Sequence, residues 1–213
     1  MKYPLNKSLL ALTIGGILAS NAQAAITDII ISEYVEGDDY NTRAIELTNT
    51  GSEDYTFPSD LYLQYYNGSY TNNVLAATTE DVSVLSGVTI EANSTIVIIN
   101  GAAEDDLIGA ITVTDTENDI IKTTTYQEKG YSSLSFTGNA TVSLMNITDN
   151  TVYDIIGEAG TYWGADTTAR RRLTEDGLTP VQSSTYDETG WEFFVLGTFD
   201  GLGLIAYSDV YVE

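Results

Sequence analysis

The chain contains neither cysteine nor histidine. Without cysteine it has no disulfide framework, no thiolate nucleophile and no N-terminal cysteine for lipid attachment. Without histidine it lacks the commonest general base and metal ligand, which excludes Ser-His-Asp and Cys-His catalytic sites. A zinc site would have to consist of carboxylates alone, a ligand set that does not suit this metal. The sequence also has no phosphate-cradling or dinucleotide-binding glycine motif.

Basic residues are scarce, with 8 Lys and Arg against 31 Asp and Glu and a formal net charge of -23. A surface of this sign repels nucleic acids and anionic lipids at long range, so direct nucleic-acid binding is not expected. A simpler interpretation of the acidity is that it keeps an exported protein in solution.

A long apolar run occurs near the N-terminus, at Leu9–Leu18. It follows Lys2 and Lys7 and precedes the small-residue sequence Ala22-Gln23-Ala24, which is the pattern of a secretory signal peptide. The run is shorter than the ~20 residues that span a bilayer. We therefore predict a signal peptide over residues 1–24, cleavage near Ala24-Ala25, and a secreted protein that is extracellular or periplasmic. The predicted domain covers 25–203, and 204–213 forms a C-terminal strand or tail.

Apolar alternation typical of β-strands dominates the rest of the chain. Ile29–Tyr34 and Ala44–Thr48 form a hairpin-like pair around the polar loop Glu36–Asn41. Further strands are predicted at 61–66, 82–85, 88–90, 95–100, 111–113, 119–124, 140–146, 151–156, 168–173 and 191–196. A short helical turn is predicted at Gly101–Ile108. Many short strands separated by turn signals indicate an all-β sandwich or barrel.

Each strand of the first pair keeps one carboxylate, Glu33 or Glu46, and Arg43 lies nearby in the sequence. We interpret them as an ion-paired structural feature at a sheet edge. The alternative is a glycosidase-type pair, which requires two carboxyl groups roughly 5 to 9.5 Å apart in a cleft.

Carboxylate-rich loops make calcium the more plausible ligand, because hard cations take six to eight oxygen ligands. The candidate ligands are Glu36, Asp38 and Asp39, and similar loops occur at 104–106 and 115–119. None matches the EF-hand loop. The alternative is that these carboxylates are solvated surface charge.

Tyrosine is frequent, with 15 residues, and Tyr62 and Tyr66 share one face of a predicted strand while Tyr65 lies on the other. Exposed rings of this kind stack on sugars or anchor a protein partner. The alternative is that tyrosine is simply a good strand residue.

Three consecutive cations stand at 170–172. In a strand, Arg170 and Arg172 share a face and Arg171 points away, so they form no continuous phosphate-binding patch. We expect them to pair with local carboxylates.

An ordered set of blocks resembles the lamin-tail domain as it occurs in secreted bacterial proteins, often beside an extracellular nuclease of the endonuclease/exonuclease/phosphatase family. The blocks span about Ile29 to Gly203 and read ISEYVEG, RAIELTNTG, VTIEANSTIVIIN, SLSFTGNATVSLMNITDNTVYDIIGEAG, ARRRL and WEFFVLGTFDGLG. The resemblance implies an immunoglobulin-like β-sandwich without a catalytic centre, used for targeting or for contacts with partners. A nuclease domain is absent from this sequence, so nuclease activity is not expected of it.

Three functions follow, in order of preference. The first is a secreted, non-catalytic binding or targeting module that contacts a protein or an extracellular polymer such as a polysaccharide. The second is an accessory to an extracellular nuclease system for DNA or phosphate scavenging. The third is a carboxylate-based hydrolase.

Overall fold

The computed structural model describes residues 24–38, 41–67, 73–74, 85–100, 103, 105–111, 120–124, 134, 136–158, 160–172 and 180–204. The predicted signal peptide up to residue 23, the predicted strand residues 82–84 and 112–113, and the C-terminal 205–213 lie outside the described residues.

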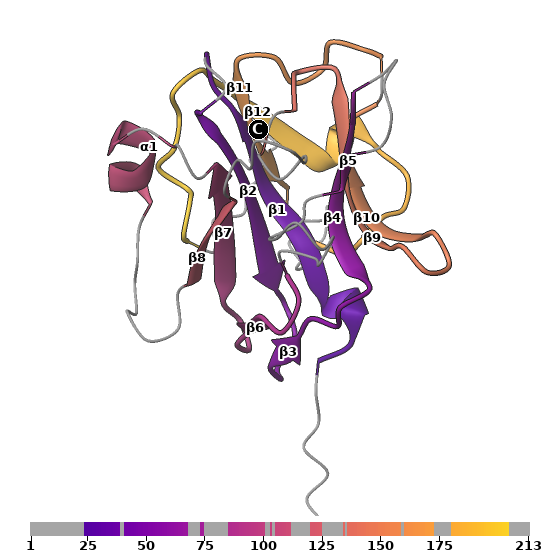
Figure 1. The fold of residues 1–213 in the computed structure, drawn as a ribbon. Helices are drawn as coiled ribbons and strands as arrows, with labels where there is room; N and C mark the ends of the chain where they lie inside the picture. Colours follow the sequence, from indigo (N-terminus) through magenta and orange to yellow (C-terminus); the bar gives the residue numbers. More distant parts are fainter. Residues whose placement is uncertain are drawn as a thin grey trace, which may run out of the picture.

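Most described strands belong to two sheets that face each other (Figure 1). The first has the order β12-β11-β1-β2-β7-β8, formed by Trp191–Val195, Thr167–Arg171, Ile29–Glu36, Arg43–Asn49, Thr95–Asn100 and Ile120–Thr124. The second has the order β10-β9-β4-β5, formed by Thr151–Ile156, Ala140–Asn146, Leu61–Asn67 and Asn73–Val74. A small two-stranded sheet pairs β3, Tyr55–Thr56, with β6, Thr89–Ile90. This architecture confirms the predicted all-β, immunoglobulin-like sandwich.

The strand pairs are antiparallel except for β7 and β8, which run parallel. The predicted hairpin-like pair is confirmed as β1 and β2, and a turn containing Asn150 at φ 59° joins β9 to β10. Three predicted strands match β7, β9 and β10 residue for residue. The predicted helical turn at Gly101–Ile108 corresponds to helix α1, Asp105–Ala110, and Glu188–Gly190 forms a short 3-10 helix before β12. The two-residue strands β3 and β5 carry too little pattern to be predicted from sequence.

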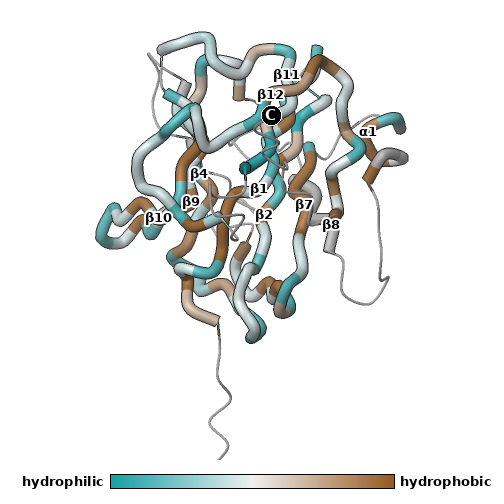
Figure 2. Tube along the Cα trace, turned by 180° about the vertical axis from the view of Figure 1, so that it is seen from behind, coloured by the Kyte–Doolittle hydropathy of each residue, from teal (hydrophilic) through white to brown (hydrophobic). Residues whose placement is uncertain are grey.

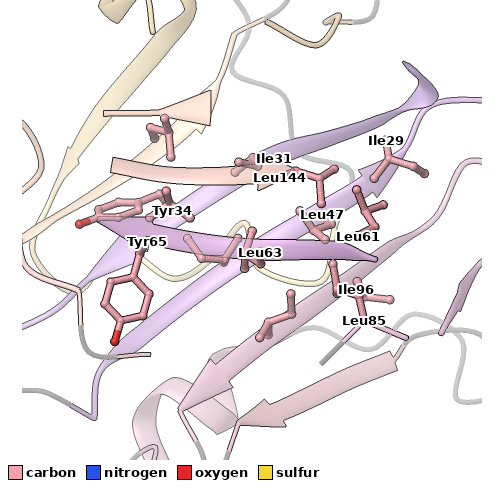
Figure 3. Packing of buried hydrophobic residues seen from close by; sticks show 14 of the residues in the cluster. Ile29, Ile31, Tyr34, Leu47, Leu61, Leu63, Tyr65, Leu85, Ile96 and Leu144 are labelled. Atoms are coloured by element: carbon pink, nitrogen blue, oxygen red, sulfur yellow. The ribbon is translucent and has the colours of Figure 1, made fainter. Parts of the chain in front are cut away.

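The main core lies between the two sheets, as Figure 3 shows. Ile29, Ile31 and Leu47 of the larger sheet point toward Leu63 and Leu144 of the smaller one. All eight residues of β1 are buried, including Ser32, Glu33 and Glu36, so both faces of this strand are covered. Figure 2 shows the same segregation, with apolar colour along the strands and polar colour at the turn between β9 and β10.

A second apolar cluster covers part of the outer face of the six-stranded sheet. Val35, Ala44 and Val97 of the sheet contact Leu107 of α1 and Leu202 of the segment after β12. The segment from Phe199 to Leu204 is therefore packed onto the sheet although it contains no regular strand.

A β-bulge in β1 decides which side chains reach this outer face. The pairing register with β2 shifts between Ile31 and Glu33. Without the bulge, Glu33 would share the core face with Ile31, two residues earlier. With it, Tyr34 takes the core face, and Ser32 and Glu33 both lie on the outer face.

Candidate functional site

The candidate site is the polar patch on the outer face of the six-stranded sheet, centred on Glu33 and Glu46. These residues are directly opposite each other in the β1–β2 pair, so their side chains leave the same face. Each residue is only 1% exposed. Sequence reasoning predicted this pair, but it placed the pair at a sheet edge. β1 and β2 are instead central strands of the sheet.

Both oxygens of Glu46 accept hydrogen bonds. The Ser32 hydroxyl donates to Oε1 at 2.6 Å, and the backbone N–H of Gly203 donates to Oε2 at 2.8 Å. Thr48 donates in turn to the Ser32 hydroxyl at 2.8 Å. Two neighbouring strands and the 199–204 segment therefore meet at this carboxyl group.

The sequence suggested that Glu33 pairs with Arg43, but in the structure Glu33 pairs with Arg170. The Arg170 Nε donates to Glu33 Oε2 at 3.1 Å, because β11 places Arg170 directly opposite Glu33 on the other side of β1. The second Glu33 oxygen, Oε1, is buried and has no hydrogen-bond partner among the described residues. Arg170 also bonds Asp200 at 2.5 Å and stacks on Phe194, with 4.6 Å from its guanidinium carbon to the ring centroid.

Burial changes the acidity of both carboxyl groups. Desolvation raises the pKa of Glu33 from 4.5 to about 7, although the nearby charge of Arg170 acts in the opposite direction. Desolvation, and then the charge of Glu33, raise the pKa of Glu46 from 4.5 to about 8. Raised carboxyl pKa values also occur in catalytic acids, so access to the pair decides its function.

The 199–204 segment closes the pair from solvent. A side chain at Gly201 would overlap Arg170 Nε and Glu33 Oε2, so glycine permits the backbone to lie directly on this ion pair. Leu202 is fully buried beside Val35 and Val97, and Gly203 bonds Glu46. A polysaccharide therefore cannot contact these carboxylates in this structure.

The predicted calcium ligands are divided between different environments. Glu36 is buried; its Oε1 binds Arg43 Nη2 at 2.8 Å and its Oε2 accepts from the backbone N–H of Asp166 at 2.5 Å. Burial raises the pKa of Glu36, while Asp166 N–H and Arg43 counteract that rise. Asp38 is exposed, and Asp39 lies outside the described residues.

Calcium at this loop stays a prediction, and the ion would compete with Arg43 for Glu36. In the described part of the chain, no cluster of three Asp or Glu side chains could hold a metal ion. A higher melting temperature in calcium than in chelator, lost in Asp38→Asn, would support the predicted site. Equal melting temperatures would contradict it.

Tyr62 lacks the exposure that the binding prediction for Tyr62 and Tyr66 assumes. Tyr62 is only 3% exposed, so its ring does not lie on an open surface, and Tyr66 is half-buried. Tyr65 faces the core, as the alternation predicted. The most exposed aromatic ring among the described residues is Tyr162, at 83%, which has no strand pattern to single it out.

The three cations separate as predicted. Arg170 lies on the outer face, whereas Arg171 points inward, bonds Asp154 at 2.5 Å and stacks on Trp191. Asp154 also accepts from the backbone N–H of Ile31 at 2.7 Å, so this buried ion pair joins the two sheets at the bulges of β1 and β10. Sequence reasoning missed Asp154, because a single acid in an alternating strand predicts exposure.

A search of curated proteins finds no match to the chain. None of the described helices has the length and apolarity to cross a membrane. The family model for the Lamin Tail Domain matches residues 22–159, which include β1, β2, β7 and the β9–β10 hairpin. With that match over more than half of its length, the chain belongs to the lamin tail domain family.

Proposed function

We propose that this protein is a secreted, non-catalytic binding module that contacts a protein or an extracellular polymer. The proposal of export rests on the N-terminal pattern of Lys2, Lys7 and the apolar run Leu9–Leu18. The proposal of binding rests on the immunoglobulin-like fold of the family, whose members serve as interaction modules.

The proposal that the protein is non-catalytic rests on one observation: the 199–204 segment covers the Glu33–Glu46 pair. A glycosidase needs two carboxyl groups in a cleft that admits the sugar and a water molecule. Here the 199–204 segment fills the space above the pair, and Glu33 Oε2 is already paired with Arg170. The carboxylates act as structural groups that hold the segment on the sheet.

Contacts with a partner then fall on the exposed surface. Among the described residues, several large apolar side chains are exposed: Tyr162 at 83%, Val195 at 80% and Val181 at 71%. Isolated exposed apolar groups are common in proteins, but aromatic rings contribute disproportionately to binding energy. Tyr162 therefore replaces Tyr62 as the aromatic side chain to test.

A turnover assay tests the non-catalytic part directly. The mature chain is incubated with panels of polysaccharides and phosphoesters, and product is measured beside Glu33→Gln and Glu46→Gln. We expect no product above the buffer control for any of the three proteins. Turnover by the wild-type chain that disappears in Glu33→Gln would overturn the proposal.

A further inference from the structure

The outer-face carboxylates have too few hydrogen-bond donors for two ionised groups. Glu46 accepts from Ser32 and Gly203, and Glu33 Oε2 accepts from Arg170, but Glu33 Oε1 has no partner among the described residues although it is buried. A buried carboxylate oxygen without a donor carries a free-energy penalty. A donor is therefore missing at this position.

The Glu33–Glu46 pair also lacks positive charge. Among the described residues, Arg170 is the cation that contacts the pair, and it also binds Asp200, whose side chain is 81% exposed. Asp200 is solvated, and its hydrogen bond with Arg170 lowers its pKa, so it remains charged. One guanidinium thus faces two buried carboxyl groups, and the Ser32 hydroxyl, the Gly203 N–H and Thr95 supply the other polar contacts of Glu46.

A metal ion does not fit this arrangement. Calcium needs six or more oxygen ligands, whereas both oxygens of Glu46 and one oxygen of Glu33 already accept hydrogen bonds. A proton on the pair supplies both the missing hydrogen-bond donor and the missing positive charge. Two close carboxyl groups in a site without water cannot both ionise.

We propose that Glu33 and Glu46 share one proton, and that this proton holds the 199–204 segment closed over the sheet as a pH-dependent flap. The raised pKa values of both groups agree with retention of one proton at neutral pH. Loss of the proton at alkaline pH leaves two buried negative charges beside one arginine. In the closed state, Gly201, Leu202 and Gly203 separate the pair from solvent. Opening the segment therefore hydrates the two charges.

Opening has a consequence at the surface. Leu202 covers Val35, Ala44 and Val97, so a lifted segment exposes apolar residues of two central strands and the neighbouring β7. The flap therefore couples the protonation of two carboxyl groups to the exposure of an apolar surface.

The first test is an NMR titration of the mature chain labelled with ¹³C at the glutamate carboxyl carbons, from pH 4 to pH 10. We expect two resonances to titrate between about pH 6 and pH 9 while the exposed glutamates titrate near their usual pKa. In Glu33→Gln the remaining resonance, from Glu46, should titrate at least about one unit lower, because the Glu33 charge that raises the Glu46 pKa is removed. Titration of every glutamate below pH 6 would overturn the proposal. A calcium-dependent shift of the two resonances would also overturn it, in favour of a metal site.

The second test follows the flap by hydrogen exchange at the Gly203 amide, corrected for the intrinsic pH dependence of exchange. We expect protection at Gly203 to fall at least about tenfold from pH 7 to pH 9, the effect of roughly one pKa unit. Protection of the Ile98 amide, in the core strand β7, should stay higher than that of Gly203 at every pH, because the flap opens without global unfolding. In Glu46→Gln the fall at Gly203 should be absent; Glu33→Gln serves as a second variant if the first does not fold. Equal falls in wild type and variant, or no fall at all, would overturn the flap.

Discussion

Glu46 is fully enclosed, and its two oxygens join three segments of the chain, Ser32 of β1, its own strand β2 and Gly203. Both oxygens of its carboxyl group accept hydrogen bonds, but the group is buried away from water. The residue is therefore stable as a neutral or proton-sharing group and costly as a free carboxylate. This makes the stability of the whole protein sensitive to pH.

Glu46→Gln tests that sensitivity. The folded-state pKa of Glu46, about 8, exceeds its ordinary value of 4.5, so between these pH values the folded state binds more protons than the unfolded state. This contribution to stability is complete below pH 4.5 and is lost as the pH rises to about 8. Between pH 5 and pH 9, urea denaturation should show wild type losing on the order of 3 kcal/mol relative to Glu46→Gln. Parallel pH profiles for the two proteins would contradict this account.

Asp154 is the second residue whose removal should be costly. Replacement by alanine leaves the buried Arg171 guanidinium without its carboxylate and the Ile31 amide without its acceptor. Breaking a buried pair in this way costs about 3–5 kcal/mol, measured as the free energy of unfolding. The exposed Glu53→Gln serves as the control and should change stability by less than about 0.5 kcal/mol. A loss below about 1 kcal/mol in Asp154→Ala would show that the pair is not a structural connection between the sheets.

At the scale of elements, the 199–204 segment behaves as a part of the sheet without being a strand. Gly201 permits its close approach, Leu202 anchors it in the second apolar cluster, and Gly203 supplies the hydrogen bond to Glu46. These three consecutive residues account for the closure of the candidate site.

Gly201→Ala tests the close approach. The added methyl group would overlap Arg170 and Glu33, so the segment must shift and the Gly203 hydrogen bond should weaken. We expect a loss of about 1–3 kcal/mol in unfolding free energy, the usual cost of overpacking. Gly190→Ala is the matched control, because a Cβ at Gly190 meets nothing within 4 Å. Equal stability of the two variants would contradict the packing described here.

Much of this organisation was predictable from sequence, because strands such as Thr95–Asn100 and Ala140–Asn146 carry strong β patterns. The pair Glu33 and Glu46 was also predictable, since the hairpin-like unit places them on facing strands. Its partner was not: Arg170 lies 137 residues from Glu33 in sequence, and local pattern does not report such pairing. The bulge between Ile31 and Glu33 and the closing segment were hidden for the same reason.

At the scale of the whole molecule, two apolar clusters and several buried ion pairs hold the six-stranded sheet against the second sheet and the closing segment. Arg171 and Asp154 connect it to the second sheet, and Arg170 and Glu33 lie beneath the closing segment. Strands β11 and β12 lie beyond the region matched by the family model yet complete this sheet. Because its central carboxylates are enclosed, the proposed partner would contact the exposed surface of the molecule.

Processing at the N-terminus is a prediction at this scale. Cleavage after Ala24 would convert the Ala25 amide, which already donates to Asp28 Oδ2 at 3.1 Å, into a charged amine beside that carboxylate. The intact mass of the exported protein should be that of a chain beginning at Ala25. Because the new amine pairs with Asp28, Asp28→Asn should lower the unfolding free energy of the cleaved protein by about 0.5–1 kcal/mol. Export of the uncleaved chain would contradict the predicted signal peptide.

Affinity capture tests the central claim, that this sandwich binds a partner, most directly. The immobilised mature chain, Tyr162→Ser and an unrelated protein of similar negative charge are each exposed to the culture fluid and surface extract of the host. We expect saturable retention of a defined protein or polysaccharide by the wild-type chain and weaker retention by Tyr162→Ser. Retention no greater than that of the unrelated acidic protein would contradict a binding function.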